Sequence, residues 1–226
     1  MMKISKSTMD VLKNFSEINQ SIVIKEGNQV RTISALKNIL AKASVGENFP
    51  KDFAIYDLPT FIGFHSTMND PDFEFGDECM TLSDDKGKGK YFYAEESVVV
   101  TPPEKEIEMP ESDINFELKT DVLEDIMKKS NILKVVDVCL KSCPKSNGLY
   151  LYVTNKNNDS SNDYSVKVGE STGKKFNIVF KRENLKIIPG DYTVTVANGI
   201  SHFNNTNPKV SLEYWIALEA SSNYGE

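Results

Sequence analysis

Hydrophobic positions recur with a helical period at one place in each half of the chain. From Ser7 to about Asn19 apolar residues return every three or four positions, and residues from Thr120 to about Ser130 do the same. Both stretches contain the phrase Asp-Val-Leu, and the two copies lie 111 residues apart. Ser7, with Asp10 three residues later, and Thr120 are residue types that cap helices, so we expect a helix to begin at each. The expected buried sides hold Val11, Leu12, Phe15, Ile18 and Ile22 in the first helix and Val122, Leu123 and Ile126 in the second.

Strand patterns follow each predicted helix. In the first half two short strands are expected around Gly27-Asn28, and in the second half two strands around a turn at 144–148. Each half then shows a strand that leads into a short helix, at 52–64 and again at 175–188. The same order of elements is therefore predicted twice.

The two copies align with an offset of 124 residues in this region, which pairs Ile55 with Val179 and Tyr56 with Phe180. The longer second copy is explained by a polar loop at 155–163, which we expect to be mobile. Each half is expected to end in strands. In the first half these form a hairpin at 80–96, and in the second half the strand at 190–198 is expected to pair with the strand at 209–220.

A proline-rich acidic stretch separates the halves. Residues 98–113 contain Pro102, Pro103 and Pro110, which disfavour both a helix and a central strand. We therefore predict an α+β protein of two similar domains, each with β-sheets and two helices. The expected boundaries are 1–108 and 112–226, with 98–113 as an extended connector.

Charge is distributed unevenly along the chain of 226 residues, whose formal net charge is -7. Residues 51–113 hold 16 acidic and 5 basic side chains, whereas 1–31 hold 5 basic and 3 acidic and 119–145 hold 6 basic and 4 acidic. Net acidity alone argues against a nucleic-acid partner. The segregation leaves two interpretations: ordinary solvated faces, or a mildly basic surface on the helices and an acidic surface elsewhere for different partners.

Reactive and metal-binding residue types are sparse. The three cysteines, Cys79, Cys139 and Cys143, are an odd number without an export signal, which favours a reducing cytosol and packing roles. The two histidines, His65 after the short helix and His202 in a Gly/Asn-rich loop, have no ligand cluster at metal spacing. No apolar run is long enough to span a membrane. We expect no metal, no cofactor and no catalytic activity.

Several segments together resemble the sliding clamps of T-even-type bacteriophages, the processivity factors of the phage DNA polymerase. Their order and spacing are similar over nearly the whole chain, and Phe53–Leu58, FAIYDL, is the most specific of them. The similarity fades at 33–50, 69–90 and 155–170, where we expect differing loops. The segments that carry the resemblance are 2–19, 53–64, 98–103 with 107–110, 187–199 and 214–220.

The resemblance implies a homotrimer that closes head-to-tail into a ring of six domains around duplex DNA. The helices would line the hole, edge strands would pair between neighbours, and lysines on the helices would face the phosphate backbone without reading sequence. The family pattern suggests a basic residue at position 131, and Asn131 departs from that pattern. The implied DNA-facing residues are Lys3, Lys6, Lys13, Lys119, Lys128, Lys129 and Lys134.

The resemblance also implies an apolar pocket for partner peptides, between the connector and the C-terminal strand. The implied partners are the phage DNA polymerase, the ATPase clamp loader and a late-transcription factor, in the cytoplasm of the infected bacterium. Because side chains alternate along a strand, only about half of the strand residues can face such a pocket. The implied residues are Ile107, Met109 and Pro110 on the connector and Trp215, Ile216, Ala217 and Leu218 on the strand.

Two other hypotheses fit the residues without a ring. A β-rich phage structural or assembly protein would need no lysines on its helices for function. A monomeric adaptor would bind peptides without encircling DNA.

Overall fold

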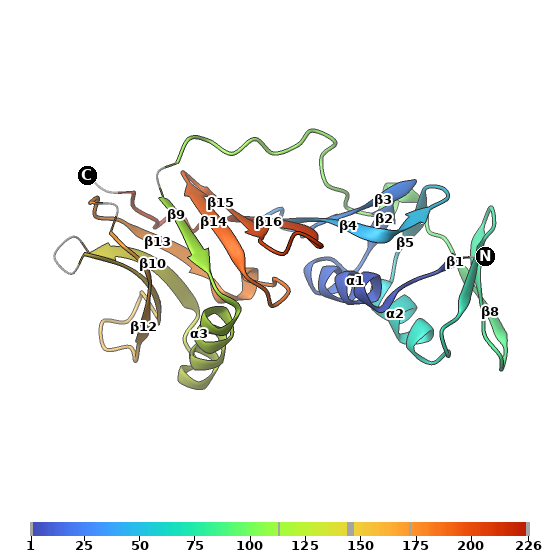
Figure 1. Cartoon of the computed structure of the whole chain (residues 1–226), viewed down its shortest axis with the longest axis horizontal. Coiled ribbons are helices and arrows are strands. Elements are labelled where there is room, and N and C mark those ends of the chain that lie inside the picture. The colour runs from blue at the N-terminus through green and yellow to red at the C-terminus, as the bar shows by residue number, and fades with distance from the viewer. Residues whose placement is uncertain (1, 113, 144–146, 172, 225–226) are drawn as a thin grey trace. The chain divides into compact units, whose positions relative to one another are not determined.

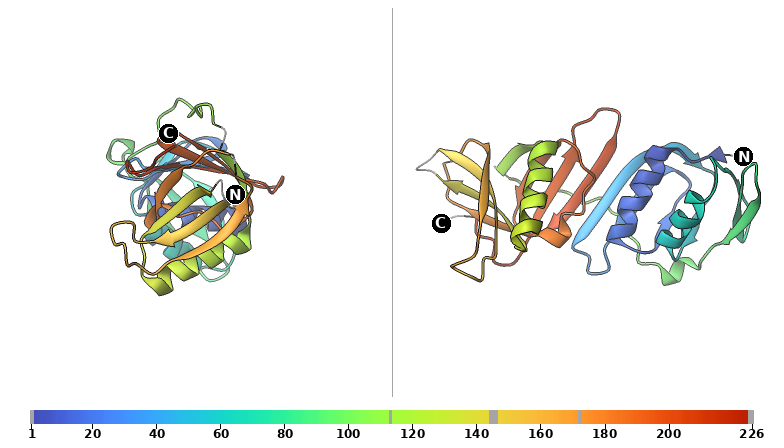
Figure 2. Two further views of the ribbon diagram at one scale, coloured as in Figure 1. Left: turned by 90° about the vertical axis from the view of Figure 1, so that its left-hand side faces the viewer. Right: turned by 90° about the horizontal axis from the view of Figure 1, so that it is seen from below.

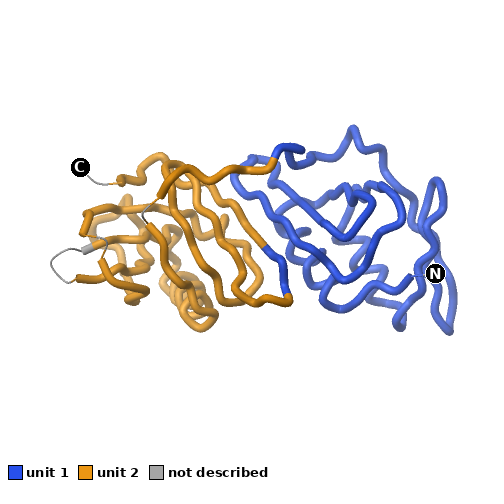
Figure 3. Tube along the Cα trace, turned by 45° about the horizontal axis from the view of Figure 1, so that its top comes forward, with its two compact units in different colours: residues 1–105, 210–212 blue, residues 106–209, 213–226 orange. Residues whose placement is uncertain are grey.

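The computed structural model describes residues 2–112, 114–143, 147–171 and 173–224, and its α-helices and most of its strands are labelled in Figure 1. The chain divides into two compact units (Figure 3). Unit 1 comprises Met1–Lys105 with Val210–Leu212, and unit 2 comprises Glu106–Lys209 with Glu213–Glu226. Each unit combines β-strands with helical elements, so the predicted α+β class is confirmed.

Unit 1 joins several antiparallel strands to two α-helices within its described residues. Strands β1, β6, β7 and β8 form one sheet in that order, β2 pairs with β5, and β3 pairs with β4. The helices lie side by side (Figure 2). The elements are β1 (Met2–Lys3), α1 (Lys6–Ile18), β2 (Ile22–Ile24), β3 (Gly27–Ile33), β4 (Ile39–Phe49), β5 (Phe53–Ile55), α2 (Leu58–Ser66), β6 (Asp72–Phe75), β7 (Cys79–Ser83), β8 (Lys88–Phe92) and the 3-10 turn η1 (Glu96–Val98).

The predicted apolar side of α1 forms part of the core, because Leu12 and Phe15 have no exposed surface. The helix begins earlier than expected. The hydroxyl of Ser5, not of Ser7, accepts a hydrogen bond from the backbone N–H of Thr8 at 3.3 Å. Both serines fit a capping position by type, and the prediction chose the wrong one.

Helix α2 follows β5 as predicted. The carboxylate of Asp57 accepts hydrogen bonds from the backbone N–H of Thr60 at 2.9 Å and from its hydroxyl at 2.7 Å. Leu58 and Phe61 are buried, and the ring of Phe61 lies 6.4 Å from that of Phe73 in β6. Contacts between aromatic rings thus bind α2 to the sheet of β1, β6, β7 and β8.

Unit 2 contains two antiparallel sheets and, among its described residues, one α-helix. The strand orders are β12-β11-β10-β13 and β9-β14-β15-β16, the residues of β16 from Glu213 onward belonging to this unit. The elements are β9 (Ile114–Leu118), α3 (Thr120–Leu133), β10 (Asp137–Cys143), β11 (Gly148–Thr154), β12 (Tyr164–Gly169), β13 (Asn177–Lys181), the 3-10 turn η3 (Arg182–Asn184), β14 (Tyr192–Ala197), β15 (Ile200–Asn205) and β16 (Ser211–Ala217).

Helix α3 packs its predicted apolar side between the two sheets of unit 2. Leu123 and Ile126 are buried and, with side chains from five strands, surround an apolar cavity of about 20 Å³. The second helix expected in this unit is only the single 3-10 turn η3. Pro189 follows closely and disfavours helical backbone at the residue before it, which limits the length of helix available.

The two units repeat one arrangement of strands. A strand after the first helix pairs antiparallel with the strand before the second helical element, β2 with β5 in unit 1 and β10 with β13 in unit 2. The alignment of Tyr56 with Phe180 is wrong, because Tyr56 is 65% exposed and Phe180 is 2% exposed. Phe180 corresponds instead to Ile55, because each is the last buried residue of its strand.

Strand β15 has no counterpart among the predicted elements. The segments at 190–198 and 209–220 are not direct partners, because β15 lies between β14 and β16. Asn198-Gly199 forms the two-residue turn between β14 and β15, with φ of 79° at Gly199, and Asn-Gly is a strong hairpin signal. The polar residues of β15 concealed the strand, and His202 lies in it rather than in a loop.

Segments expected to differ as loops also contain regular structure. β4 lies within 33–50, most of the sheet of β6, β7 and β8 lies within 69–90, and β12 lies within 155–170. His65 is part of α2 instead of following it. These segments are therefore strands with their connections rather than loops throughout.

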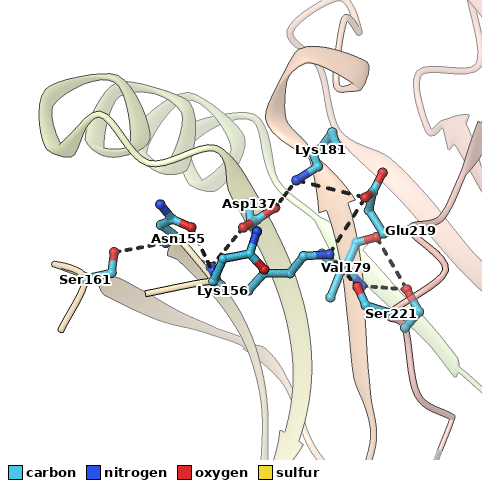
Figure 4. Close-up of polar contacts among 10 residues, drawn as sticks. Asp137, Asn155, Lys156, Ser161, Val179, Lys181, Glu219 and Ser221 are labelled. Atoms are coloured by element: carbon cyan, nitrogen blue, oxygen red, sulfur yellow. Dashed lines mark hydrogen bonds and ion pairs between the residues drawn. The ribbon is translucent and has the colours of Figure 1, made fainter. Parts of the chain in front are cut away.

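A buried ion pair fixes one end of the sheet in unit 2 (Figure 4). Asp137 has no exposed side-chain surface, and its carboxylate lies 2.6 Å from Lys181 Nζ and accepts the backbone N–H of Lys156 at 2.9 Å. Hydrogen bonding to Asp137 raises the pKa of Lys181. Lys156 and Lys181 both lie within 4 Å of Glu219, at 3.7 and 3.9 Å. The first residues of the loop at 155–163, which we expected to be mobile, are therefore bonded to the strands.

We predict that Lys181→Met destabilises the protein by about 3 kcal/mol or more, because the buried carboxylate of Asp137 loses its counterion. Lys25→Met removes a lysine from the exposed acids Asp52 and Glu96 and should cost less than about 1 kcal/mol. Denaturant unfolding measures both. Adding Asp137→Asn to Lys181→Met should recover part of the stability. Equal effects of the two lysine variants would contradict the prediction.

Candidate nucleic-acid interface and partner pocket

The outer side of α1 carries alternating charges. We call Lys6, Asp10, Lys13 and Glu17 the α1 stripe; all four are exposed, as the helical period predicts. Lys6 Nζ lies 2.7 Å from the carboxylate of Asp10, one turn along the helix. The stripe holds two bases and two acids, so its formal charge is zero.

The outer side of α3 carries the α3 stripe, which is Asp121, Glu124, Lys128 and Asn131, all exposed. Lys129 lies beside it and is turned away. Its ammonium group is 2.5 Å from the carboxylate of Asp125 and 4.0 Å from the ring centre of Tyr164. The hydrogen bond to Asp125 raises the pKa of Lys129, so the ammonium is already engaged within unit 2.

The structure divides the seven predicted DNA-facing lysines into two groups. Lys3 is paired with Asp70, Lys6 with Asp10, Lys119 with Asp191 and Lys129 with Asp125. The other three form no ion pair with any described residue. They are Lys13, Lys128 and Lys134, the last at the C-terminal cap of α3 with a φ of 54°.

Carboxylates from distant segments hold the starts of both helices, and no local signal in the sequence marks them. Glu47 of β4 accepts the backbone N–H of Ser5 at 2.5 Å and the hydroxyl of Thr8. Burial alone would raise the pKa of Glu47, but the hydrogen bonds from Thr8 and Ser5 outweigh it, so the pKa is lowered. Negative charge at a helix N-terminus is also favoured by the helix dipole.

Asp191 plays the same part for α3. Its carboxylate accepts the backbone N–H and the hydroxyl of Thr120, each at 2.9 Å, and lies 3.0 Å from Lys119 Nζ. The hydrogen bond from the Thr120 backbone and those from Lys119 and the Thr120 hydroxyl lower the pKa of Asp191 to about 2. Thr120 was expected to cap this helix, but it is the first helical residue and is itself held by Asp191.

The strand residues predicted for a peptide pocket point to opposite sides of β16. Trp215 faces His202 of β15, with ring centres 4.7 Å apart, and His202 Nε2 lies 2.9 Å from Glu213. Ile216 points to the other side and has no exposed surface. Ile216, which was predicted for the pocket, therefore lies in the core, because alternation along a strand turns both neighbours of Trp215 to the opposite side.

The remaining pocket residues are accessible to different extents. Ala217 and Leu218 are half-buried, and the backbone N–H of Leu218 donates to the carbonyl oxygen of Gly199 at 3.0 Å. On the connector Ile107 and Met109 are half-buried, whereas Pro110 is exposed. Trp215 is 6% exposed.

No group of three or more metal-binding side chains is assembled among the residues that the structure describes. Of the helices described, none has both the length and the apolar character needed to cross a membrane. Cys139 is buried, and burial raises the pKa of its thiol to about 11. That thiol is a packing residue rather than a nucleophile at neutral pH.

The fold is that of the DNA clamps. The chain superimposes on a PCNA of A. fulgidus bound to the C-terminal region of FEN-1 with a TM-score of 0.72, at 11% identity and 98% coverage of each chain. A Helicobacter pylori beta clamp bound to a DNA ligase peptide gives a TM-score of 0.62 at 14% identity, over 100% of this chain and 68% of that one.

Sequence comparison defines the family. Residues 115–220 match the model described as gp45 sliding clamp, C terminal, and residues 3–72 match DNA polymerase processivity factor. The sliding clamp of Vibrio phage KVP40 is 34% identical over 225 residues, covering 97% of this chain and 100% of the relative. That of Enterobacteria phage T4 is 30% identical over 234 residues, with 99% of each covered. The chain belongs to the family of phage sliding clamps.

We predict that Asp191→Asn lowers the melting temperature at pH 7 and that the difference from the unchanged protein fades as the pH falls. The pKa of Asp191 is lowered from 3.8 to about 2 on folding, so its contribution is present above pH 3.8 and disappears as the pH falls toward about 2. Thermal melts across this range test the prediction. Asp159→Asn, in the exposed loop after β11, is the matched control. A decrease independent of pH would contradict it.

Proposed function

We propose that three copies of this chain close into a ring around duplex DNA and tether the phage replicative DNA polymerase. The observation that carries the proposal is the pair of exposed stripes on α1 and α3, one in each of two units that repeat the same arrangement. Each stripe combines lysine with acidic residues and contains no residue arrangement suited to reading bases. The individual lysines can approach the phosphate backbone at any sequence, and the neighbouring acids keep their attraction weak.

Two strands at sheet ends support ring closure. β8 ends the sheet of unit 1 and β12 ends a sheet of unit 2 in the described strand order. Phe92 of β8 is 64% exposed, although it is a large apolar residue. Pairing β8 of one copy with β12 of the next would cover both edges and this aromatic ring, and such head-to-tail contacts close when the rotation divides a full turn.

The same proposal assigns the chain no reaction of its own. The weakly attractive stripes leave DNA retention to the closed ring, and the ATP needed to open it would be used by a separate clamp loader. We place this activity in the cytoplasm of the infected bacterium, where the phage replicates its DNA.

Partner peptides are proposed to bind at the apolar residues of the connector and β16. PCNA and the beta clamp named above were each solved with a partner peptide, which supports this kind of partner. The phage polymerase, the clamp loader and a late-transcription factor are the partners that we propose. Without Ile216, the pocket comprises Ile107, Met109, Pro110, Trp215, Ala217 and Leu218.

We predict that the triple variant Lys6→Glu, Lys13→Glu and Lys128→Glu abolishes stimulation of the polymerase, because repulsion replaces attraction of the phosphates. Light scattering should still give a species near three times 25.4 kDa, about 76 kDa. The matched control changes Lys37, Lys86 and Lys141 to Glu, which alters net charge equally outside the helices. Full stimulation by the first triple would favour a structural protein, and a monomer at every concentration of unchanged protein would favour an adaptor.

We predict that Met109→Asp weakens binding of a clamp-binding peptide from the polymerase by about ten-fold or more, since a charge would replace an apolar contact in the pocket. Fluorescence anisotropy of the labelled peptide measures the affinity. Thr101→Asp adds the same charge at an exposed connector position and should leave binding unchanged. Equal weakening in both variants would argue against a local pocket.

A further inference from the structure

Arg182 extends over the C-terminal end of α3. It is the first residue of η3, and its backbone N–H donates to the carbonyl oxygen of Val136 at 2.9 Å, which fixes the turn beside the helix end. Its Nη1 lies 2.8 Å from Oδ1 of Asn131 and 3.4 Å from the carbonyl oxygen of Ser130. The guanidinium group therefore reaches the α3 stripe, although Arg182 lies 51 residues after Asn131.

The charge of Arg182 is not neutralised within the described part of the chain, where it forms no ion pair. Its hydrogen bonds to Asn131 and Ser130 both use Nη1, which leaves donors on Nη2 and Nε for another acceptor. Its side chain is half-exposed. An arginine held in this way offers fixed N–H groups to a phosphate with little further loss of side-chain freedom.

The position of this charge changes the electrostatics of α3. The last carbonyl groups of a helix carry partial negative charge, which repels phosphates. The α3 stripe itself has two acids, Asp121 and Glu124, against one base, Lys128. Arg182 adds one positive charge at the end where the repulsion from the carbonyl groups is greatest, and it brings the stripe to the neutral balance of the α1 stripe.

We propose that Arg182 is a DNA-contacting residue of this clamp, presented to the phosphate backbone by Asn131. This deepens the proposed function and rests on it, because α3 must face the duplex. Asn131 acts as a positioning residue: its side-chain oxygen holds the guanidinium group at the edge of the stripe. The contact is to phosphate and carries no sequence preference.

The test measures binding of the assembled protein to a short DNA duplex by fluorescence anisotropy over a series of salt concentrations. Arg182→Gln should weaken binding. A plot of the logarithm of the DNA-binding constant against the logarithm of the salt concentration should also become less steep, by about one for each phosphate that is no longer neutralised. Arg182→Lys should retain most of the slope, because it keeps the charge. Asn131→Ala should fall between Arg182→Gln and the unchanged protein.

A merely structural role of Arg182 would give a different pattern. Lysine cannot reproduce the planar group at the helix end, so thermal stability and DNA binding would then fall alike in Arg182→Lys and Arg182→Gln, which would overturn the proposal. Lys141→Gln, on the side of β10 opposite the helix-facing Val138, is the control for removal of a charge.

Lys128→Gln separates the two proposals. If it weakens binding and Arg182→Gln does not, only the inference fails; if neither does, the DNA-facing role of α3 fails as well.

Discussion

Both charged stripes depend on carboxylates that bind the N-termini of their helices from distant segments. Glu47 holds the start of α1, and Asp191 holds the start of α3. The first backbone N–H groups of a helix have no hydrogen-bond acceptor inside the helix. These carboxylates provide acceptors at the two helix starts. Because side chains on a helix follow its rotation, fixing the first turn also fixes which residues face outward. The positions of Lys13 and Lys128 follow from these contacts as much as from helix propensity.

Helical periodicity predicted the helices well because buried and exposed positions are cleanly separated in both. Leu12 and Leu123 are buried, and Lys13 and Lys128 are exposed as expected. The helix starts were harder to predict, since Ser5 and Ser7 have the same chemistry and only the fold brings Glu47 to one of them. Strand β15 was missed because one of its sides is polar, with His202 and Asn204, while Ser201 and Phe203 on the other side are buried.

The candidate site shows the same limit. The sequence predicted that Lys6, Lys13 and Lys128 are exposed. It did not predict that Lys119 and Lys129 are paired with acids. The sequence also showed that Asn131 departs from the family pattern. Nothing in it indicated that the side chain of Arg182 lies against Asn131. That contact joins residues 51 positions apart through the pairing of β10 with β13, which periodicity within one helix does not reveal.

The balance of charge on the stripes has a consequence for how a clamp would hold DNA. Lys6 is already paired with Asp10, so an approaching phosphate exchanges one anionic partner for another and gains little free energy. Weak attraction allows movement along the duplex, but it cannot by itself keep the protein there. In the ring that we propose, retention would come from closure, and the strength of closure would depend on the strand edges at β8 and β12. Acids beside the helix lysines would thus favour sliding, while the exposed edges would determine how long the clamp stays on DNA.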